Sequence, residues 1–178
     1  MHRRHLLVAA LGLLLPKGAL ATVMTRRSLQ WLLLASDAVV LAVPRAHHAA
    51  WREGRIETTV TLELLAVLAG SIAPGRPLRV AVPGGTVGEL SQRLEGAPSL
   101  PVGVPVVLLL EPERQGLRTV LNLSAGVLPV TPNTPPRVLP TRAEGLTFLP
   151  GALPQGWELP PEGMEIIEFS SRVRALRR

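Results

Sequence analysis

The stretch WREGRIETTVTLELLAVLAG, residues 51–70, decides the fold. From Ile56 to Leu62 apolar and polar residues alternate, as they do in a strand with one buried face. After Glu63 the residues are apolar at every position to Leu68. We therefore expect one strand from Ile56 to Leu68 whose even-numbered side chains face the interior.

A strand of this length constrains the architecture. At about 3.3 Å per residue it would extend for roughly 43 Å, whereas typical strands have about 5–6 residues. Such a strand must coil and pair with two neighbours, as happens in small closed barrels. A helix from Leu62 to Leu68 is the alternative. The β-branched residues between Ile56 and Thr61 argue against a helix at the start of the stretch but do not decide its end.

The surrounding sequence offers further short strands bounded by Gly and Pro. One precedes the stretch at Val39–Arg45, followed by a hairpin turn within HHAAWREGR at Gly54. Four follow it, at Pro77–Val82, Glu89–Gly96, Val104–Pro112 and Leu117–Leu123. This spacing predicts a mainly β fold, a small OB-like closed or partly open barrel occupying residues 22–126.

Two helices are expected to flank the barrel. The short N-terminal helix would present Leu29, Leu32 and Leu33 on one face, with Ser28 or Thr25 as N-cap. Residues 127–161 are proline-rich and expected to be extended. The C-terminal amphipathic helix, within 162–178, would bury Ile166, Phe169, Val173 and Leu176.

Residues 1–21 have the three parts of a signal peptide. Arg3 and Arg4 precede an apolar run, Leu6–Leu15, and the small residues Ala19 and Ala21 form a cleavage site. The run is too short to span a bilayer. A buried N-terminal helix and an uncleaved anchor stay open as alternatives. We expect export to the periplasm or the extracellular space, with no stable transmembrane segment after cleavage.

The composition agrees with a globular exported domain. The chain has 178 residues, of which 47% are hydrophobic and 18% charged, so it can bury a core. Cleavage would leave 16 arginines against 13 acidic residues, lowering the net charge from +6 to +3. There is no cysteine, so an oxidising compartment would be tolerated without disulfides.

The ordered segments SDAVVLAV, GRIETTVTLELLAVLAG, VAVPGGTVG, LEGAPSLPVGVPVVLLLEP and LRTVLNLSAG carry a resemblance. Their order and spacing, from Ser28 to Gly126, resemble a family of uncharacterised secreted bacterial proteins, sometimes found near matrixin-type metalloproteases. The family's KG, G-P-F--GE and FL motifs are replaced here by Ala69-Gly70, Pro98–Val104 and Leu109-Leu110. The resemblance implies an OB-like barrel and export, and no mechanism.

A more distant similarity is to the netrin-like module of tissue inhibitors of metalloproteinases. Those inhibitors reach the metal through an N-terminal cysteine. Because this chain has no cysteine, no inhibitory residue carries over.

Few residues suggest catalysis. His47 and His48 are expected in a solvated loop, and adjacent strand residues would point to opposite faces, so both cannot easily bind one metal. Asp37 is the sole aspartate, and a serine triad would need it or a glutamate together with a histidine. No serine lies in a nucleophile-elbow pattern, so we expect Asp37 to act as a cap or turn residue at a helix-to-strand joint.

Three other groups have ordinary structural interpretations. PGGTVGEL, residues 83–90, lacks the lysine of a phosphate loop and is expected to be a turn between strands. Glu53, Glu57 and Glu63 are expected to be solvent-exposed charges paired with Arg55 or its neighbours. The arginines near the C-terminus are expected to form a solvated helix end: Arg172, Arg174, Arg177 and Arg178.

Nucleic-acid binding is not expected. Proteins that bind single strands stack bases on aromatic residues of the sheet. The five aromatic residues all lie outside the predicted barrel strands, namely Trp31, Trp51, Phe148, Trp157 and Phe169.

The sequence therefore predicts an exported, non-enzymatic binding module without metal or cofactor. Its partner would be a protein or a cell-envelope component, and Trp51, Arg52 and Arg55 are the interaction candidates. An accessory or inhibitor of a secreted metalloprotease is the alternative. A hydrolase in its own right lacks a catalytic constellation.

Overall fold

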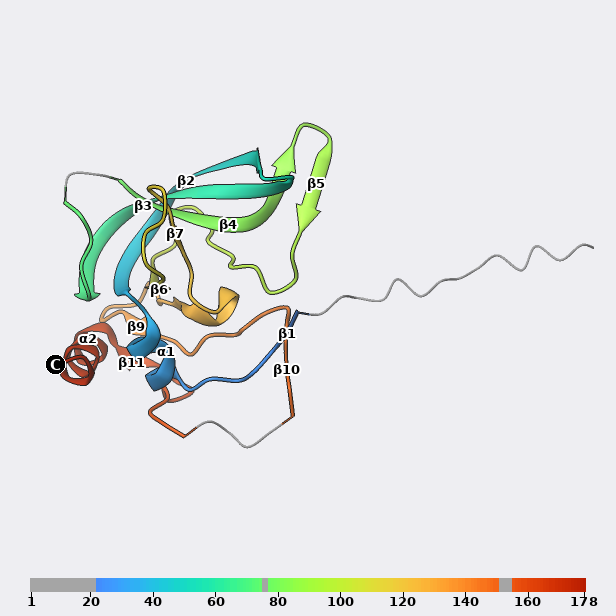
Figure 1. Cartoon of the computed structure of the whole chain (residues 1–178). Helices are drawn as coiled ribbons and strands as arrows, with labels where there is room; N and C mark the ends of the chain where they lie inside the picture. Colours follow the sequence, from blue (N-terminus) through green and yellow to red (C-terminus); the bar gives the residue numbers. More distant parts are fainter. Residues whose placement is uncertain (1–21, 75–76, 151–154) are drawn as a thin grey trace, which may run out of the picture.

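A strongly curled antiparallel sheet, a half-barrel, forms the centre of the computed structural model, which describes residues 22–74, 77–150 and 155–178 (Figure 1). Its strands are β2 (Ala38–Arg52), β3 (Arg55–Ala69), β4 (Leu78–Val87), β5 (Leu90–Arg93), β6 (Val106–Leu110), β7 (Arg118–Thr119) and β8 (Val127–Pro129). The order is β5-β4-β3-β2-β6-β8, and β7 pairs with β4 in parallel. The mainly β prediction is confirmed.

Shorter elements surround this sheet. They are β1 (Thr22–Met24), α1 (Leu29–Ala35), the 3-10 helix η1 (Leu123–Gly126), β9 (Arg137–Val138), β10 (Leu146–Phe148), β11 (Met164–Glu165) and α2 (Ile166–Leu176). β1 pairs with β10 in parallel, and β9 pairs with β11 antiparallel. The expected signal peptide, with Ala19 and Ala21, lies outside the described residues.

The stretch that predicted the fold is a strand over its whole length. β3 pairs with β2 from end to end and with β4 from Glu57 to Leu62. The prediction of one long strand with two neighbours is confirmed, and the helical alternative at Leu62–Leu68 is wrong.

The alternation along β3 holds only in its first half. Val60 and Leu62 are buried, as predicted. Beyond them the β2–β3 register skips Leu65 and Leu68, and each such bulge reverses which face the following side chains take. Leu64 precedes both bulges, lies opposite Ala42 and is 37% exposed, because β4 pairs with β3 only as far as Leu62. Leu68, beyond the bulge at Leu65, is buried on the other face of the sheet. The prediction that every even position faces the interior is therefore wrong beyond Leu64.

The central part of the sheet is buried on both faces. Inside the curl, one apolar cluster joins side chains of β2, β3, β4 and β6, including Val40, Val60, Val80 and Leu108. On the opposite face a second cluster joins the sheet to α1 and α2, through residues such as Leu33, Leu109, Leu128 and Phe169. β6 contributes to both clusters, which explains why its sequence VVLLL is apolar without interruption.

Both helices follow their predicted patterns. Leu29, Leu32 and Leu33 of α1 are buried, and the Trp31 N–H donates to the Ser28 hydroxyl at 3.2 Å, which makes Ser28 the N-cap. In α2, Phe169 and Val173 are fully buried, and Ile166 and Leu176 pack partly against the same cluster.

β2 extends well beyond its predicted end. A turn within HHAAWREGR was expected, but the strand continues through Pro44 and His47 to Arg52, and only Glu53-Gly54 turn. Pro44 has no N–H to donate, and strands accept proline most easily beside a bulge. The β2–β3 register shifts immediately after Pro44 and provides that bulge.

The turn expected within residues 83–90 lies at Gly88-Glu89, between β4 and β5, while Pro83–Val87 belong to β4. Gly84 and Gly85 permit a close approach of chains rather than a reversal. A Cβ on Gly84 would lie 2.7 Å from the Gln92 carbonyl oxygen, and one on Gly85 would lie 2.4 Å from the Thr58 hydroxyl oxygen.

The later part of the chain also differs in detail. Of the expected strand Leu117–Leu123, only Arg118–Thr119 form a strand, β7, and η1 follows. Residues on either side of β7 contact β6, since Val120 bridges Leu110 and the Glu111 N–H donates to the Thr119 carbonyl at 2.9 Å. β8, β9 and β10 lie within the segment 127–161 that was expected to be extended, and β8 joins the main sheet.

Candidate functional site

The tip of the β2–β3 hairpin carries the three interaction candidates. Trp51 lies opposite Ile56, and Arg52 lies opposite Arg55. Residues directly opposite one another point to the same face, while successive residues point to opposite faces. The structure therefore brings the two arginines together and places Trp51 on the other face of the same tip. Trp51 is 52% exposed and lies on β2, so its expected position outside the barrel strands is wrong.

The arginine face of the tip is only partly neutralised. Arg52 Nε lies 3.3 Å from Glu57 Oε1, and Arg55 Nη2 lies 4.0 Å from Glu57 Oε2. One carboxylate thus faces two guanidinium groups. A groove of about 520 Å³ separates this face from the loop after β6, which adds Arg114. Glu53 lines the same groove, so three arginines face two glutamates, and the tip presents a mildly basic face with exposed guanidinium groups.

The glutamates of β3 form the expected ion pairs, but one is not solvent-exposed as predicted. Glu63 pairs with Arg45, and both side chains are about half exposed. The Glu57 side chain is only 15% exposed, because it lies between the arginine pair and the adjoining strand β4. The carboxylate of Glu57 therefore serves to hold Arg52 and Arg55 in place.

His47 and His48 are on β2 rather than in a loop, so that prediction is wrong. As neighbours in a strand they point to opposite faces. His47 Nε2 lies 2.8 Å from the Leu100 carbonyl oxygen. Across the described residues, no group of three or more His, Cys, Asp or Glu side chains could hold a metal ion.

Asp37 lies at the helix-to-strand joint, as expected, but its carboxylate forms an ion pair. Arg118 Nη1 donates to Asp37 Oδ2 at 2.6 Å and to the Glu111 carbonyl at 2.9 Å. Arg118 was not among the residues predicted from the sequence to have a role. A single arginine in the apolar segment LRTVLNL, together with the sole aspartate of the chain, was the available signal.

The C-terminal arginines are not uniformly solvated. Arg177 donates to the Ser36 hydroxyl at 3.5 Å and to the Asp37 carbonyl at 3.4 Å. Arg172 pairs with Glu168 at 3.2 Å and lies over the Trp157 ring. These contacts link α2 to the start of β2 and to the segment that precedes α2.

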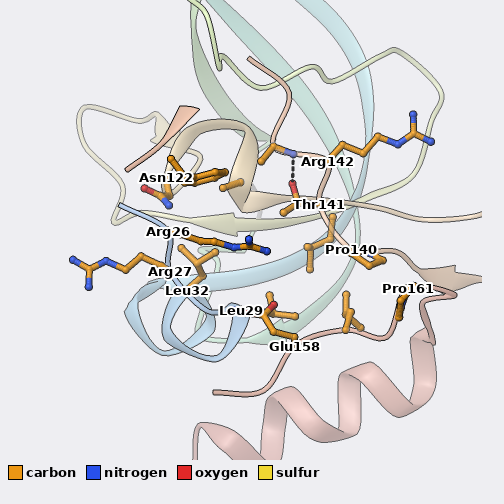
Figure 2. Close-up of a pocket in the computed structure, with 15 residues that line it drawn as sticks. Arg26, Arg27, Leu29, Leu32, Asn122, Pro140, Thr141, Arg142, Glu158 and Pro161 are labelled. Atoms are coloured by element: carbon orange, nitrogen blue, oxygen red, sulfur yellow. Dashed lines mark hydrogen bonds between the residues drawn. The ribbon is translucent and has the colours of Figure 1, made fainter. Parts of the chain in front are cut away.

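A second feature is a cavity of about 470 Å³ between α1, η1 and β8. Segments from distant parts of the chain line it, including Arg26, Leu29, Asn122, Leu128, Thr141 and Glu158. Figure 2 shows the Arg26 side chain extending among these residues, while the guanidinium groups of Arg27 and Arg142 point outward. Arg26 was not among the candidates predicted from the sequence. Its only signal was the Arg-Arg pair directly before the N-cap Ser28.

Among the helices of the described ranges, none is long and apolar enough to cross a membrane. Comparisons with protein-family models, with curated proteins and with solved structures found no match for this chain.

Proposed function

We propose that this protein is an exported, non-enzymatic binding module that recognises a protein or a cell-envelope component through the tip of the β2–β3 hairpin. The observation that carries the proposal is Trp51, which is 52% exposed on one face of that tip while Arg52 and Arg55 occupy the other. Trp and Arg are enriched among the few residues that dominate binding energy at protein interfaces.

Burial of the exposed part of Trp51 supplies a substantial binding energy. A tryptophan side chain buries up to about 250 Å², and burial of apolar surface contributes about 25 cal/mol per Å². Covering its exposed half is therefore worth about 3 kcal/mol. The basic face adds a preference for a partner with acidic groups.

The finer fold that we propose is a small OB-like barrel. Its support is the chain of contacts that runs from β2 through β3 and β4 to β7, and from the neighbours of β7 back to β6 and β2. A five-stranded, partly open barrel is the usual form of that fold, and it serves as a binding scaffold in many proteins.

Site-specific cross-linking tests the proposed surface. A photo-reactive amino acid replaces Trp51 in one variant and Ile167 in another; Ile167 is 74% exposed but lies on α2. After incubation with the secreted and periplasmic fractions, we expect a discrete adduct from position 51 and none from position 167. Arg52→Ala with Arg55→Ala should reduce that adduct. Equal labelling at both positions would refute the proposal.

The identity of the captured partner decides between the two interpretations of the module. A secreted metalloprotease as the partner would favour the accessory or inhibitor role. Hydrolase panels with the purified protein should be blank, and specific turnover of any substrate would contradict the non-enzymatic proposal.

A further inference from the structure

The cavity beside α1 has the size and lining of a small-ligand site. Its volume of about 470 Å³ lies within the roughly 300–1,000 Å³ that is usual for such sites. Its floor is formed by buried aliphatic side chains at the edge of the helix-covered core: Leu29, Leu32, Ala125, Leu128 and Leu159. An apolar body of a ligand would lie against this floor.

The Arg26 guanidinium is the feature of the cavity that favours an anion. Three arginines and one glutamate line the cavity, namely Arg26, Arg27, Arg142 and Glu158. Glu158 is already engaged, because its Oε1 accepts the Leu29 N–H at 3.0 Å. Arg27 lies over the Trp31 ring, 4.8 Å from its centroid. Arg26 extends into the cavity (Figure 2), and no carboxylate of the described residues lies within ion-pair distance of it.

The remaining polar groups of the cavity limit the chemical class of ligand that it can bind. The Thr141 hydroxyl donates to the Ser124 carbonyl at 2.9 Å and accepts the Ala143 N–H at 3.2 Å, so its hydrogen-bonding capacity is largely used. The Asn122 side chain makes no capping hydrogen bond to η1 and is available. A peptide would bring several amide groups that need partners in the cavity, and leaving them unpaired is costly. A ligand with one anionic end and an otherwise apolar body matches the groups that line the cavity better than a peptide does.

We propose that the cavity binds the anion of a medium-chain fatty acid. The carboxylate is held by the Arg26 guanidinium and the Asn122 amide, and the alkyl chain lies on the leucine floor. The site is independent of the hairpin tip, because none of its lining residues belongs to β2 or β3.

Titration of the full chain with sodium decanoate, followed by NMR of the leucine methyl groups, tests this proposal. We expect saturable shifts at Leu29, Leu32 and Leu128 with a dissociation constant below about 1 mM. Arg26→Gln should weaken binding at least about tenfold, the effect expected for loss of one charge-assisted hydrogen bond. Arg93→Gln removes an equal charge on β5, where the side chain is 84% exposed, and should leave the affinity within about twofold.

Three outcomes would overturn the assignment. The first is the absence of shifts at these methyl groups. The second is equal binding of 1-decanol, or equal weakening by Arg26→Gln and Arg93→Gln, since either shows that Arg26 does not hold a carboxylate. The third is tighter binding of a short apolar peptide with a free C-terminal carboxylate than of decanoate. Thermal unfolding of Arg26→Gln, whose side chain is exposed, verifies that the variant is folded.

Discussion

Arg118 Nη1 lies 2.6 Å from Asp37 Oδ2, so the only aspartate of the chain joins β7 to the junction of α1 and β2. The Arg118 side chain is 8% exposed, and its Nη2 donates to the Ser71 carbonyl after β3 at 3.3 Å. Arg177 of the C-terminal region adds a contact to the Asp37 carbonyl. One ion pair thus connects segments that lie far apart in the sequence.

Asp37→Ala should lower the free energy of unfolding by about 2–3 kcal/mol. Removing one partner of a buried pair costs about 3–5 kcal/mol, and the effect is smaller here because the Asp37 side chain is 41% exposed. Urea unfolding measures the change. Glu63→Ala breaks the exposed pair with Arg45 and should cost less than about 1 kcal/mol. Similar losses in the two variants would show that the Asp37–Arg118 pair contributes no more to the free energy of unfolding than the exposed Arg45–Glu63 pair.

Gly70→Ala should be more destabilising than Gly54→Ala. Both glycines have similar positive φ angles, 76° and 78°, so each substitution pays a similar backbone cost of about 1–2 kcal/mol. A Cβ on Gly70 would lie 2.1 Å from the Asp37 carbonyl oxygen, whereas nothing lies within 4 Å of one on Gly54. The difference between their unfolding midpoints in urea isolates the steric clash. Equal midpoints would show that the β3 terminus does not pack against Asp37.

The features that were predicted correctly from the sequence are those determined by residues that lie close together in the chain. The Ser28 cap, the apolar face of α2 and the long strand β3 follow from spacing within a few residues. Pro44 and the pair Gly84-Gly85 are ordinary local signals for turns, yet here they lie within strands. A bulge beside Pro44 and the close approach of neighbouring chains at Gly84-Gly85 allow these residues to lie in strands. Both features depend on the partner strand.

The candidate site was less accessible to prediction than the fold. Trp51, Arg52 and Arg55 were named from a short segment, but their division between two faces requires the register of β2 against β3. The cavity near Arg26 is formed by segments that lie more than a hundred residues apart, from Arg26 to Pro161. No spacing along the chain encodes such an assembly, which arises from the packing of α1, η1 and β8.

Phe169→Ala should destabilise the whole fold by about 3–5 kcal/mol, because Phe169 is fully buried in the cluster shared by the helices and the sheet. Ile167→Ala, two residues earlier and 74% exposed, should change the stability by less than about 0.5 kcal/mol. Both variants are compared by circular dichroism and tryptophan fluorescence during urea unfolding. Separate transitions for the helix signal and the fluorescence would show that α2 does not share the core of the sheet.

Export is predicted from residues 1–21 alone. Protein isolated from the native host should have lost about 21 residues, as the position of the small residues Ala19 and Ala21 implies. Intact-mass analysis of the secreted and periplasmic fractions measures this loss. Recovery of the full-length chain in the cytosol only would contradict export, and recovery of the full-length chain in the membrane would support an uncleaved anchor.

The end of the β3–β4 pairing at Leu62 gives a sharp test of the fold, since strict alternation buries Leu64 and the structure leaves it exposed. Leu62 is 3% exposed inside the curl, so Leu62→Asp buries an unpaired carboxylate at a cost of several kcal/mol. Total domain stabilities are about 5–15 kcal/mol, so little folded protein should remain. Strict alternation makes the same prediction for Leu64→Asp. In the structure Leu64 is 37% exposed, and the cost of Leu64→Asp should be below about 1.5 kcal/mol.

Aspartate substitutions at other positions of β3 extend this comparison of buried and exposed residues. Val60→Asp should unfold the protein, whereas Thr59→Asp, on the other face and half-buried, should cost about 1 kcal/mol. Beyond the bulge at Leu65, Leu68 is 4% exposed and Val67 is 38% exposed, and Leu68 is buried on the helix-covered face rather than inside the curl. Both Leu68→Asp and Val60→Asp are therefore severe, although they act on opposite faces of the sheet. Soluble yield and urea midpoints rank the variants, and a severe Val67→Asp together with a mild Leu68→Asp would remove the bulge at Leu65 from the fold.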